Sequence, residues 1–187
     1  MKKFKLIITV AVLAVISYSC NNSAVERMVD KMQPEPVVIE QEGAGFFTPQ
    51  PGVKYVVGSD DVMDVWKKYI DAHNNRDLEL IASMNIDSTD LGNFRILSPN
   101  GQIILGSDTQ IEFLKGWFEA ENPKWKTNFS FSMRVEGQKG EWVITGSEVK
   151  KTVDGEEVTT YDVADVYIED GKIGAFWVYS RAAVPVE

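Results

Sequence analysis

The hydrophobic pattern of this chain changes its period at Pro123. Between residues 59 and 122, apolar side chains recur at the spacing of amphipathic helices. Over 125–135 apolar and polar side chains alternate, which indicates a strand with one solvated face. Further strands are predicted over 141–153, 158–169 and 172–181, because Asp154-Gly155 and Asp170-Gly171 are typical of tight turns between strands.

The segment before Pro123 predicts three helices. The first begins at Ser59-Asp60-Asp61, because serine is a good N-cap and acidic residues favour the first helical turn. Its apolar side runs to His73, and Asn74-Asn75 ends it. The second helix is predicted over 77–84, and the third begins at Ser107 or Asp108.

A hairpin is expected between the second and third helices. Its strands are predicted over 93–97 and 102–105, joined by the turn-rich segment Ser98-Pro99-Asn100-Gly101. The complete order places helices early and long strands late. This order predicts an α+β domain, with the helices on one face of a curved sheet.

Four short motifs mark these elements in a defined order. They are Trp66-x-x-Tyr69, the run from Ala72 to Leu78, Gly106-Ser107-Asp108, and Asp170-Gly171-Lys172-Ile173 followed by Trp177. Over about residues 60–182 the chain resembles this superfamily, in particular its SnoaL-like, or polyketide cyclase-like, branch. The resemblance implies a cone-shaped α+β fold, in which three N-terminal helices pack in a curved antiparallel sheet. The superfamily includes isomerases, cyclases, hydrolases, dehydratases and protein-binding modules, so the fold alone does not define a function.

The N-terminus has the pattern of a secretory signal. Lys2, Lys3 and Lys5 precede an apolar run over 6–16, which is too short for a bilayer-spanning helix of about 20 residues. Ser17-Tyr18-Ser19 then precedes Cys20, the only cysteine in the chain. This arrangement resembles the lipobox of bacterial lipoproteins, in which the cysteine is acylated. The alternative is an ordinary signal peptide with a chance cysteine.

Three regions follow from these patterns. We expect residues 1–19 to be a lipoprotein signal peptide and residues 20–58 to be a tether rich in proline and glycine, with a possible short helix over 25–32. Phe46, Phe47 and residues 55–57 are too apolar for a pure linker, so part of the tether is expected to pack on the domain as an edge strand or an arm. Residues 59–187 are expected to form the domain that resembles the SnoaL-like branch. The protein is therefore expected in the bacterial cell envelope, lipid-anchored, and either periplasmic or exposed at the surface.

Composition excludes several kinds of chemistry. The formal net charge of −9 becomes about −12 if Lys2, Lys3 and Lys5 are removed with the signal peptide, which argues against nucleic-acid binding. It also argues against attraction to anionic lipid headgroups, so an acyl chain would supply the membrane contact. With one cysteine and one histidine, we expect no disulfide, no metal site and no cofactor.

Two side chains are candidates for chemistry in the cone. His73 could be a base or polar anchor in a pocket, or it could simply bond a backbone carbonyl at the end of its helix. Asp162 and Asp165 point to opposite faces of one strand, and a buried carboxylate could act as a general base. The alternative is a carboxylate paired with Lys150 or Arg181 in solvent.

The register of the last hairpin decides the surroundings of Asp162. A two-residue loop would place Asp162 on the face of Trp177, whereas a three-residue loop with a glycine bulge would place it with Phe176 and Val178. In both cases Ala164 shares the face of Asp162, as do Val166 and Ile168, so we favour Asp162 as the inward aspartate. The predicted pocket comprises Tyr69, His73, Trp117, Asp162 and Trp177.

Two functions remain open at this level. The first is a membrane-tethered binding module that holds a small apolar or aromatic ligand in the cone, or a protein partner on the sheet. The second is an isomerase, cyclase or dehydratase that needs no cofactor and uses Asp162 or His73 as general base. The resemblance also implies a possible homodimer through the sheet.

Overall fold

The computed structural model describes residues 52–183, which lie within one compact unit of the chain, Gln41–Glu187. These residues form three helices, α3 (Asp60–Asn75), α4 (Leu78–Met84) and α5 (Ser107–Glu121). The predictions for Cys20, for the signal peptide and for the segment 25–32 lie outside the described residues. None of the helices in residues 52–183 is long and apolar enough to span a membrane.

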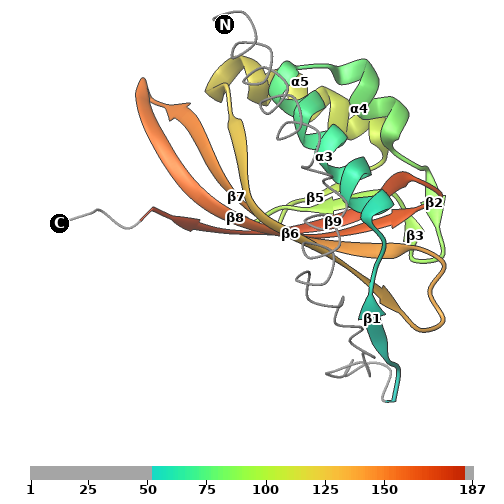
Figure 1. The fold of residues 1–187 in the computed structure, drawn as a ribbon. Coiled ribbons are helices and arrows are strands. Elements are labelled where there is room, and N and C mark those ends of the chain that lie inside the picture. The colour runs from blue at the N-terminus through green and yellow to red at the C-terminus, as the bar shows by residue number, and fades with distance from the viewer. Residues whose placement is uncertain (1–51, 184–187) are drawn as a thin grey trace, which may run out of the picture. The chain divides into compact units, whose positions relative to one another are not determined.

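The helices pack on one side of a curved, seven-stranded sheet (Figure 1). Its order is β1-β6-β7-β8-β9-β4-β5, and a separate pair is formed by β2 (Ser88–Thr89) and β3 (Gly92–Asn93). The long strands are β6 (Lys124–Val135), β7 (Glu141–Val153), β8 (Glu156–Glu169) and β9 (Lys172–Ala182). The α+β fold class and the helix-on-sheet arrangement are confirmed.

One pair in the sheet corrects the expectation of an antiparallel sheet. The predicted hairpin forms β4 (Arg95–Leu97) and β5 (Ile103–Leu105), which pair antiparallel. Strand β4 then lies parallel to β9, so the sheet is mixed. This follows from connectivity, because β4 reaches the free edge of β9 from the distant α4 and not through a tight turn.

Helix α3 supplies the centre of the core because its apolar residues recur on one face. The buried side chains are Val62, Trp66, Tyr69, Ile70, Ala72 and His73. The helix ends where Arg76 adopts a left-handed conformation, with φ 63°. Asp77 then caps α4 by accepting a hydrogen bond from the Leu80 amide at 2.9 Å.

Residues 55–57, which the sequence predicts to belong to the tether, pair with the edge of the sheet. Strand β1 (Tyr55–Val57) lies antiparallel to β6, with Tyr55 opposite Val135. The Gly58 amide continues the contact by donating to the Ser132 carbonyl at 3.0 Å. The chain therefore enters α3 from a position defined by the sheet.

The last hairpin combines features of the two predicted registers. Asp170-Gly171 forms a two-residue turn, since Glu169 pairs with Lys172. One step further, Ile168 pairs with Ile173 while Tyr167 pairs with Ala175, so Gly174 is an extra residue in β9. A Cβ atom at this position would lie 2.4 Å from Cγ2 of Thr89, which explains the glycine.

The bulge decides which β9 side chains accompany Asp162. Beyond it, Asp162 pairs with Ser180 and Ala164 pairs with Val178. These residues face the helices, as does Phe176. Trp177 pairs with Asp165 on the opposite, outer face. Asp162 therefore shares its face with Phe176 and Val178, as expected for a three-residue loop, although the turn itself has two residues.

Candidate functional site

The cone contains a cavity of about 460 Å³ between α3, α5, the β4–β5 hairpin and the inner face of the sheet. Four of the five predicted pocket residues line it, namely Tyr69, His73, Trp117 and Asp162. About half of the other lining side chains are aromatic or aliphatic: Trp66, Ile70, Ile96, Ile104, Phe113, Leu114, Trp125, Val149, Ala164, Phe176 and Val178. A concave, mostly apolar space with a few polar groups is the usual form of a small-molecule site.

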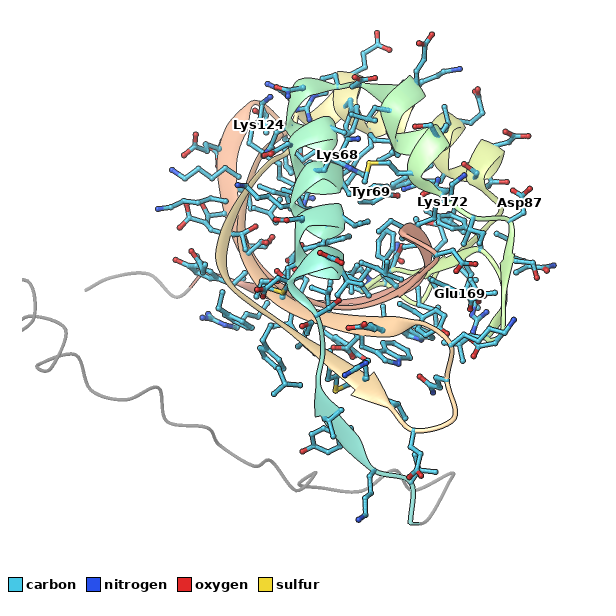
Figure 2. All side chains as sticks on the ribbon, turned by 45° about the vertical axis from the view of Figure 1, so that its right-hand side comes forward. Lys68, Tyr69, Asp87, Lys124, Glu169 and Lys172 are labelled. Carbon is cyan, nitrogen blue, oxygen red and sulfur yellow. The ribbon has the colours of Figure 1, made fainter. Side chains whose placement is uncertain are left out.

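The deep end of the cavity is formed by Tyr69, His73 and Gln110, which are all buried. Figure 2 shows Tyr69 in the space between α3 and the sheet. Its hydroxyl accepts a hydrogen bond from Nε2 of Gln110 at 2.6 Å and donates to Oδ1 of Asn85 at 3.0 Å. Burial raises the pKa of Tyr69, and the hydrogen bonds offset this only in part, so it is a neutral phenol.

Asn85 closes this buried network. Its amide nitrogen donates to Oε1 of Gln110 at 2.7 Å and to Oγ of Ser107 at 2.8 Å. The network joins α3, the end of α4 and the start of α5. Because its polar groups bond one another, it holds the deep end in shape.

His73 belongs both to the helix end and to the cavity. Its Nδ1 lies 2.8 Å from the backbone carbonyl oxygen of Tyr69, one helical turn earlier. Burial lowers the pKa of His73 to about 4; the hydrogen bond to Tyr69 opposes this change, and the charge of Arg76 adds to it. The imidazole is therefore neutral at neutral pH. The backbone contact matches one reading of the sequence, and the cavity position matches the other.

The mouth of the cavity is formed by Trp117, Glu121, Lys151, Asp162 and Ser180. Lys151 Nζ lies 2.6 Å from Oε2 of Glu121, which also accepts from Nε1 of Trp117 at 2.9 Å. Burial acts to raise the pKa of Glu121, but these hydrogen bonds lower it overall. This contact ties the end of α5 to β7.

Asp162 lies on the other side of the mouth. Its Oδ1 accepts a hydrogen bond from Oγ of Ser180 at 2.5 Å. The side chain is half-buried and faces the cavity, in agreement with its position beside Ala164. It bonds neither Lys150 nor Arg181 in the described residues, since Lys150 pairs with Glu157.

The structure does not bring Trp177 to the cavity. Its ring lies 5.5 Å from that of Trp142, and the guanidinium of Arg95 lies 5.5 Å from its centroid, on the outer face of the sheet. Asp165 shares that face, where burial raises the carboxyl pKa and a hydrogen bond with Tyr179 partly offsets the rise.

Gln110 and Asn85 are site residues that the sequence did not predict. Gln110 precedes Leu114 by one helical turn, so it lies on the apolar stripe of α5. A polar residue in that position was a usable signal. Asn85 follows α4 and had no local pattern to mark it. In residues 52–183, no three acidic or histidine side chains gather in an arrangement that could hold a metal ion.

Comparison with known proteins identifies the fold. No family model and no curated protein matches the sequence. An LEH-like epoxide hydrolase from M. tuberculosis is similar in structure, with TM-score 0.54 and 12% identity over 66% of this chain and 84% of that one. A protein assigned as a SnoaL-like polyketide cyclase from Jannaschia sp. has TM-score 0.51 and 16% identity, over 64% and 85%.

A third similar structure is described as NTF2-like, that is, nuclear transport factor 2-like. An NTF2-like protein of unknown function from Burkholderia pseudomallei has TM-score 0.50 and 17% identity, over 66% of this chain and 92% of that one. The described domain thus has the nuclear transport factor 2-like cone fold, as the sequence motifs implied. Identities this low establish the fold and leave the function to the site.

Proposed function

We propose that this protein is a binding module that holds a small apolar or aromatic ligand in its cone. The observation that carries the proposal is the hollow interior, a cavity of about 460 Å³ with mainly aromatic and aliphatic walls. At its deep end, the polar groups of Tyr69 and Gln110 already bond each other at 2.6 Å. Such a space favours burial of apolar ligand surface.

Ligand-dependent quenching of tryptophan fluorescence tests this function. Neutral bicyclic aromatics should quench the protein, because Trp66, Trp117 and Trp125 line the cavity. Replacing Trp117→Phe should reduce the quenching. The matched control is Trp177→Phe, because Trp177 lies on the outer face. Equal effects of the two substitutions, or no binding of any neutral aromatic, would contradict the proposal.

An enzyme remains the alternative, because Asp162 and His73 line the same cavity. Two structurally similar proteins are named as an epoxide hydrolase and a polyketide cyclase. His73, with its pKa lowered to about 4, would be a weak general base near neutral pH. Asp162, a carboxylate at the mouth of the same cavity, is the other candidate general base for an isomerase, cyclase or dehydratase. Turnover of a cavity ligand that is lost in Asp162→Asn while binding persists would favour this alternative.

The proposed cellular setting rests on the N-terminal sequence. Signal cleavage before Cys20 and acylation of its thiol would tether the domain to a membrane of the cell envelope. The acidic composition, with a net charge of −9, fits a domain held near the membrane by its acyl chain and not by basic residues.

We also propose that a second copy of this chain covers the outer face of the sheet. This face carries Phe129, Phe131, Val163 and Tyr179, which are 48%, 52%, 38% and 57% exposed. They come from adjacent strands, because Phe129 pairs with Gly146, which also pairs with Val163, and Val163 pairs with Tyr179. Clustered exposed aromatics of this kind mark interaction surfaces. A twofold contact would place the same patch on both subunits.

A further inference from the structure

We propose that the cavity takes an uncharged ligand with a hydroxyl group that donates a hydrogen bond to Nε2 of His73. This inference rests on the proposed binding function and specifies the ligand class. It follows from the hydrogen bonds that already occupy the polar groups of the deep end. Of those groups, the second nitrogen of His73 is the one left to recognise a ligand.

The backbone fixes the tautomer of His73. The carbonyl oxygen of Tyr69 can only accept a hydrogen bond, so Nδ1, at 2.8 Å, must carry the proton. In a neutral imidazole the other nitrogen then has a lone pair and no hydrogen. Within residues 52–183 no side chain or amide donates to Nε2. Since His73 lines the cavity, Nε2 is available to a ligand as an acceptor.

The surroundings of His73 keep it in this form. Its ring packs against those of Tyr69, Phe118 and Trp125, at centroid distances of 4.5, 6.1 and 5.6 Å. Arg76, in the next turn of the chain, bonds the carbonyl of His73 and adds a positive charge nearby. A protonated ring is disfavoured on both counts, so Nε2 does not become a donor at neutral pH. A ligand that presents a ketone or ether oxygen would therefore meet another lone pair.

The polar groups of Tyr69 and Gln110 are occupied. Nε1 of Trp66 has no hydrogen-bond partner among the described residues, but it is buried and can only donate. The hydroxyl of Tyr69 donates to Asn85 and accepts from Gln110. The carbonyl oxygen of the Gln110 side chain accepts from Asn85. A ligand that bonded any of these groups would break a buried hydrogen bond. This costs more free energy than breaking a hydrogen bond exposed to water.

The charges at the mouth argue for an uncharged ligand. Lys151 is the only cationic side chain in the cavity lining, and it is paired with Glu121 at 2.6 Å. Asp162 adds a carboxylate that is bonded only by the neutral Ser180 hydroxyl. An anionic ligand would lack a free counter-ion here and would lose its hydration.

Three neutral probes of related shape separate the contribution of the hydroxyl group to affinity from that of the aromatic ring. Calorimetry on the full-length protein would compare 2-naphthol with naphthalene, which is smaller, and with 2-methoxynaphthalene, which is larger and cannot donate. We expect 2-naphthol to bind about 3- to 10-fold more tightly than either, the usual range for one hydrogen bond. In His73→Phe the preference for 2-naphthol should be lost, and in Trp177→Phe it should persist. The anionic probe 2-naphthoate should bind least.

A second readout needs no variant. His73 is the only histidine, so its ring nitrogens can be assigned directly by long-range ¹H–¹⁵N correlation. The free protein should show a protonated Nδ1 and an unprotonated Nε2. Addition of 2-naphthol should shift the Nε2 resonance, and addition of 2-methoxynaphthalene should not.

The outcomes distinguish this inference from the proposed function. If naphthalene and both derivatives bind equally and Nε2 does not shift, the cavity binds aromatics but the hydroxyl preference is overturned. Tighter binding of 2-methoxynaphthalene or 2-naphthoate overturns it as well. If none of the probes binds, the proposed function fails and the inference fails with it.

Discussion

Nε2 of Gln110 donates a hydrogen bond to the hydroxyl of Tyr69 at 2.6 Å, in the buried centre of the domain. This contact links α5 to α3. Asn85 completes the network, because its side-chain oxygen accepts from Tyr69 and its side-chain nitrogen donates to Gln110. The cavity therefore has a deep end that is polar but already satisfied, while its walls are apolar. The contribution of the network to stability and the ligand selectivity of the cavity can be tested separately.

Removing the Tyr69 hydroxyl should destabilise the fold. In Tyr69→Phe both Gln110 and Asn85 lose a buried partner, so the free energy of unfolding should fall by about 1–3 kcal/mol. Urea denaturation followed by circular dichroism measures this change. Tyr179→Phe is the matched control, because Tyr179 is exposed on the outer face, and its effect should stay within about 0.5 kcal/mol. Equal losses in the two variants would contradict the role of the network.

His73 should make stability depend on pH in a defined window. Its pKa is lowered to about 4 in the folded protein, whereas an unfolded chain has a histidine pKa of about 6.5. The unfolded state thus binds more protons between these values. The contribution of His73 is complete above pH about 6.5 and is lost as the pH falls towards 4.

The NMR titration of His73 checks this directly. Its imidazole signals should not move between pH 8 and about 5.5, because burial among aromatic rings, with the charge of Arg76 in addition, keeps the ring neutral. Over the same range, His73→Gln should show a flatter dependence of unfolding free energy on pH than the wild type. A midpoint near the ordinary histidine value of about 6.5 would rule out a buried neutral ring.

The β9 bulge should depend on glycine. In Gly174→Ala the added Cβ would approach Cγ2 of Thr89 to 2.4 Å, so the protein should lose about 1–3 kcal/mol of stability. The double variant Gly174→Ala with Thr89→Ser removes this methyl group and keeps the hydroxyl that donates to the Gly92 carbonyl. Thermal unfolding should show partial recovery in the double variant. Additive losses would indicate that the clash with Thr89 is not the cause.

Acylation at Cys20 predicts the location of the protein. Replacing Cys20→Ala should move the protein from the membrane fraction to the soluble periplasm or the medium, because one acyl-anchoring residue is lost. Fractionation with detergent partitioning measures the shift. Unchanged partitioning of the variant would exclude the lipid anchor and favour an ordinary signal peptide.

The outer face of the sheet predicts the oligomeric state. Phe131→Glu should convert a dimer into a monomer, because a buried carboxylate in an apolar contact lacks a partner. Sedimentation velocity compares it with Ala120→Glu, which adds the same charge at an exposed position of α5. A wild-type protein that is monomeric at micromolar concentration would argue against this interface.

The change of hydrophobic period at Pro123 was sufficient to predict helices followed by strands. Helix α3 was recognisable because its apolar spacing identifies a buried face, and Asp154-Gly155 and Asp170-Gly171 marked the turns. These are local properties, since each depends on residues close together in the chain. The motifs around Tyr69 and His73 then identified the cone fold.

The composition of the cavity was decided in three dimensions. Asp162 could be favoured as inward from its strand alone, but the exclusion of Trp177 required the bulge at Gly174, which shifts β9 by one residue against β8. The bulged residue packs closely against Thr89, which is distant in sequence. Gln110 and Asn85 meet Tyr69 through contacts between helices, and no local pattern specifies such contacts. Periodicity assigns side chains to a face of one element, whereas packing between elements decides which faces meet.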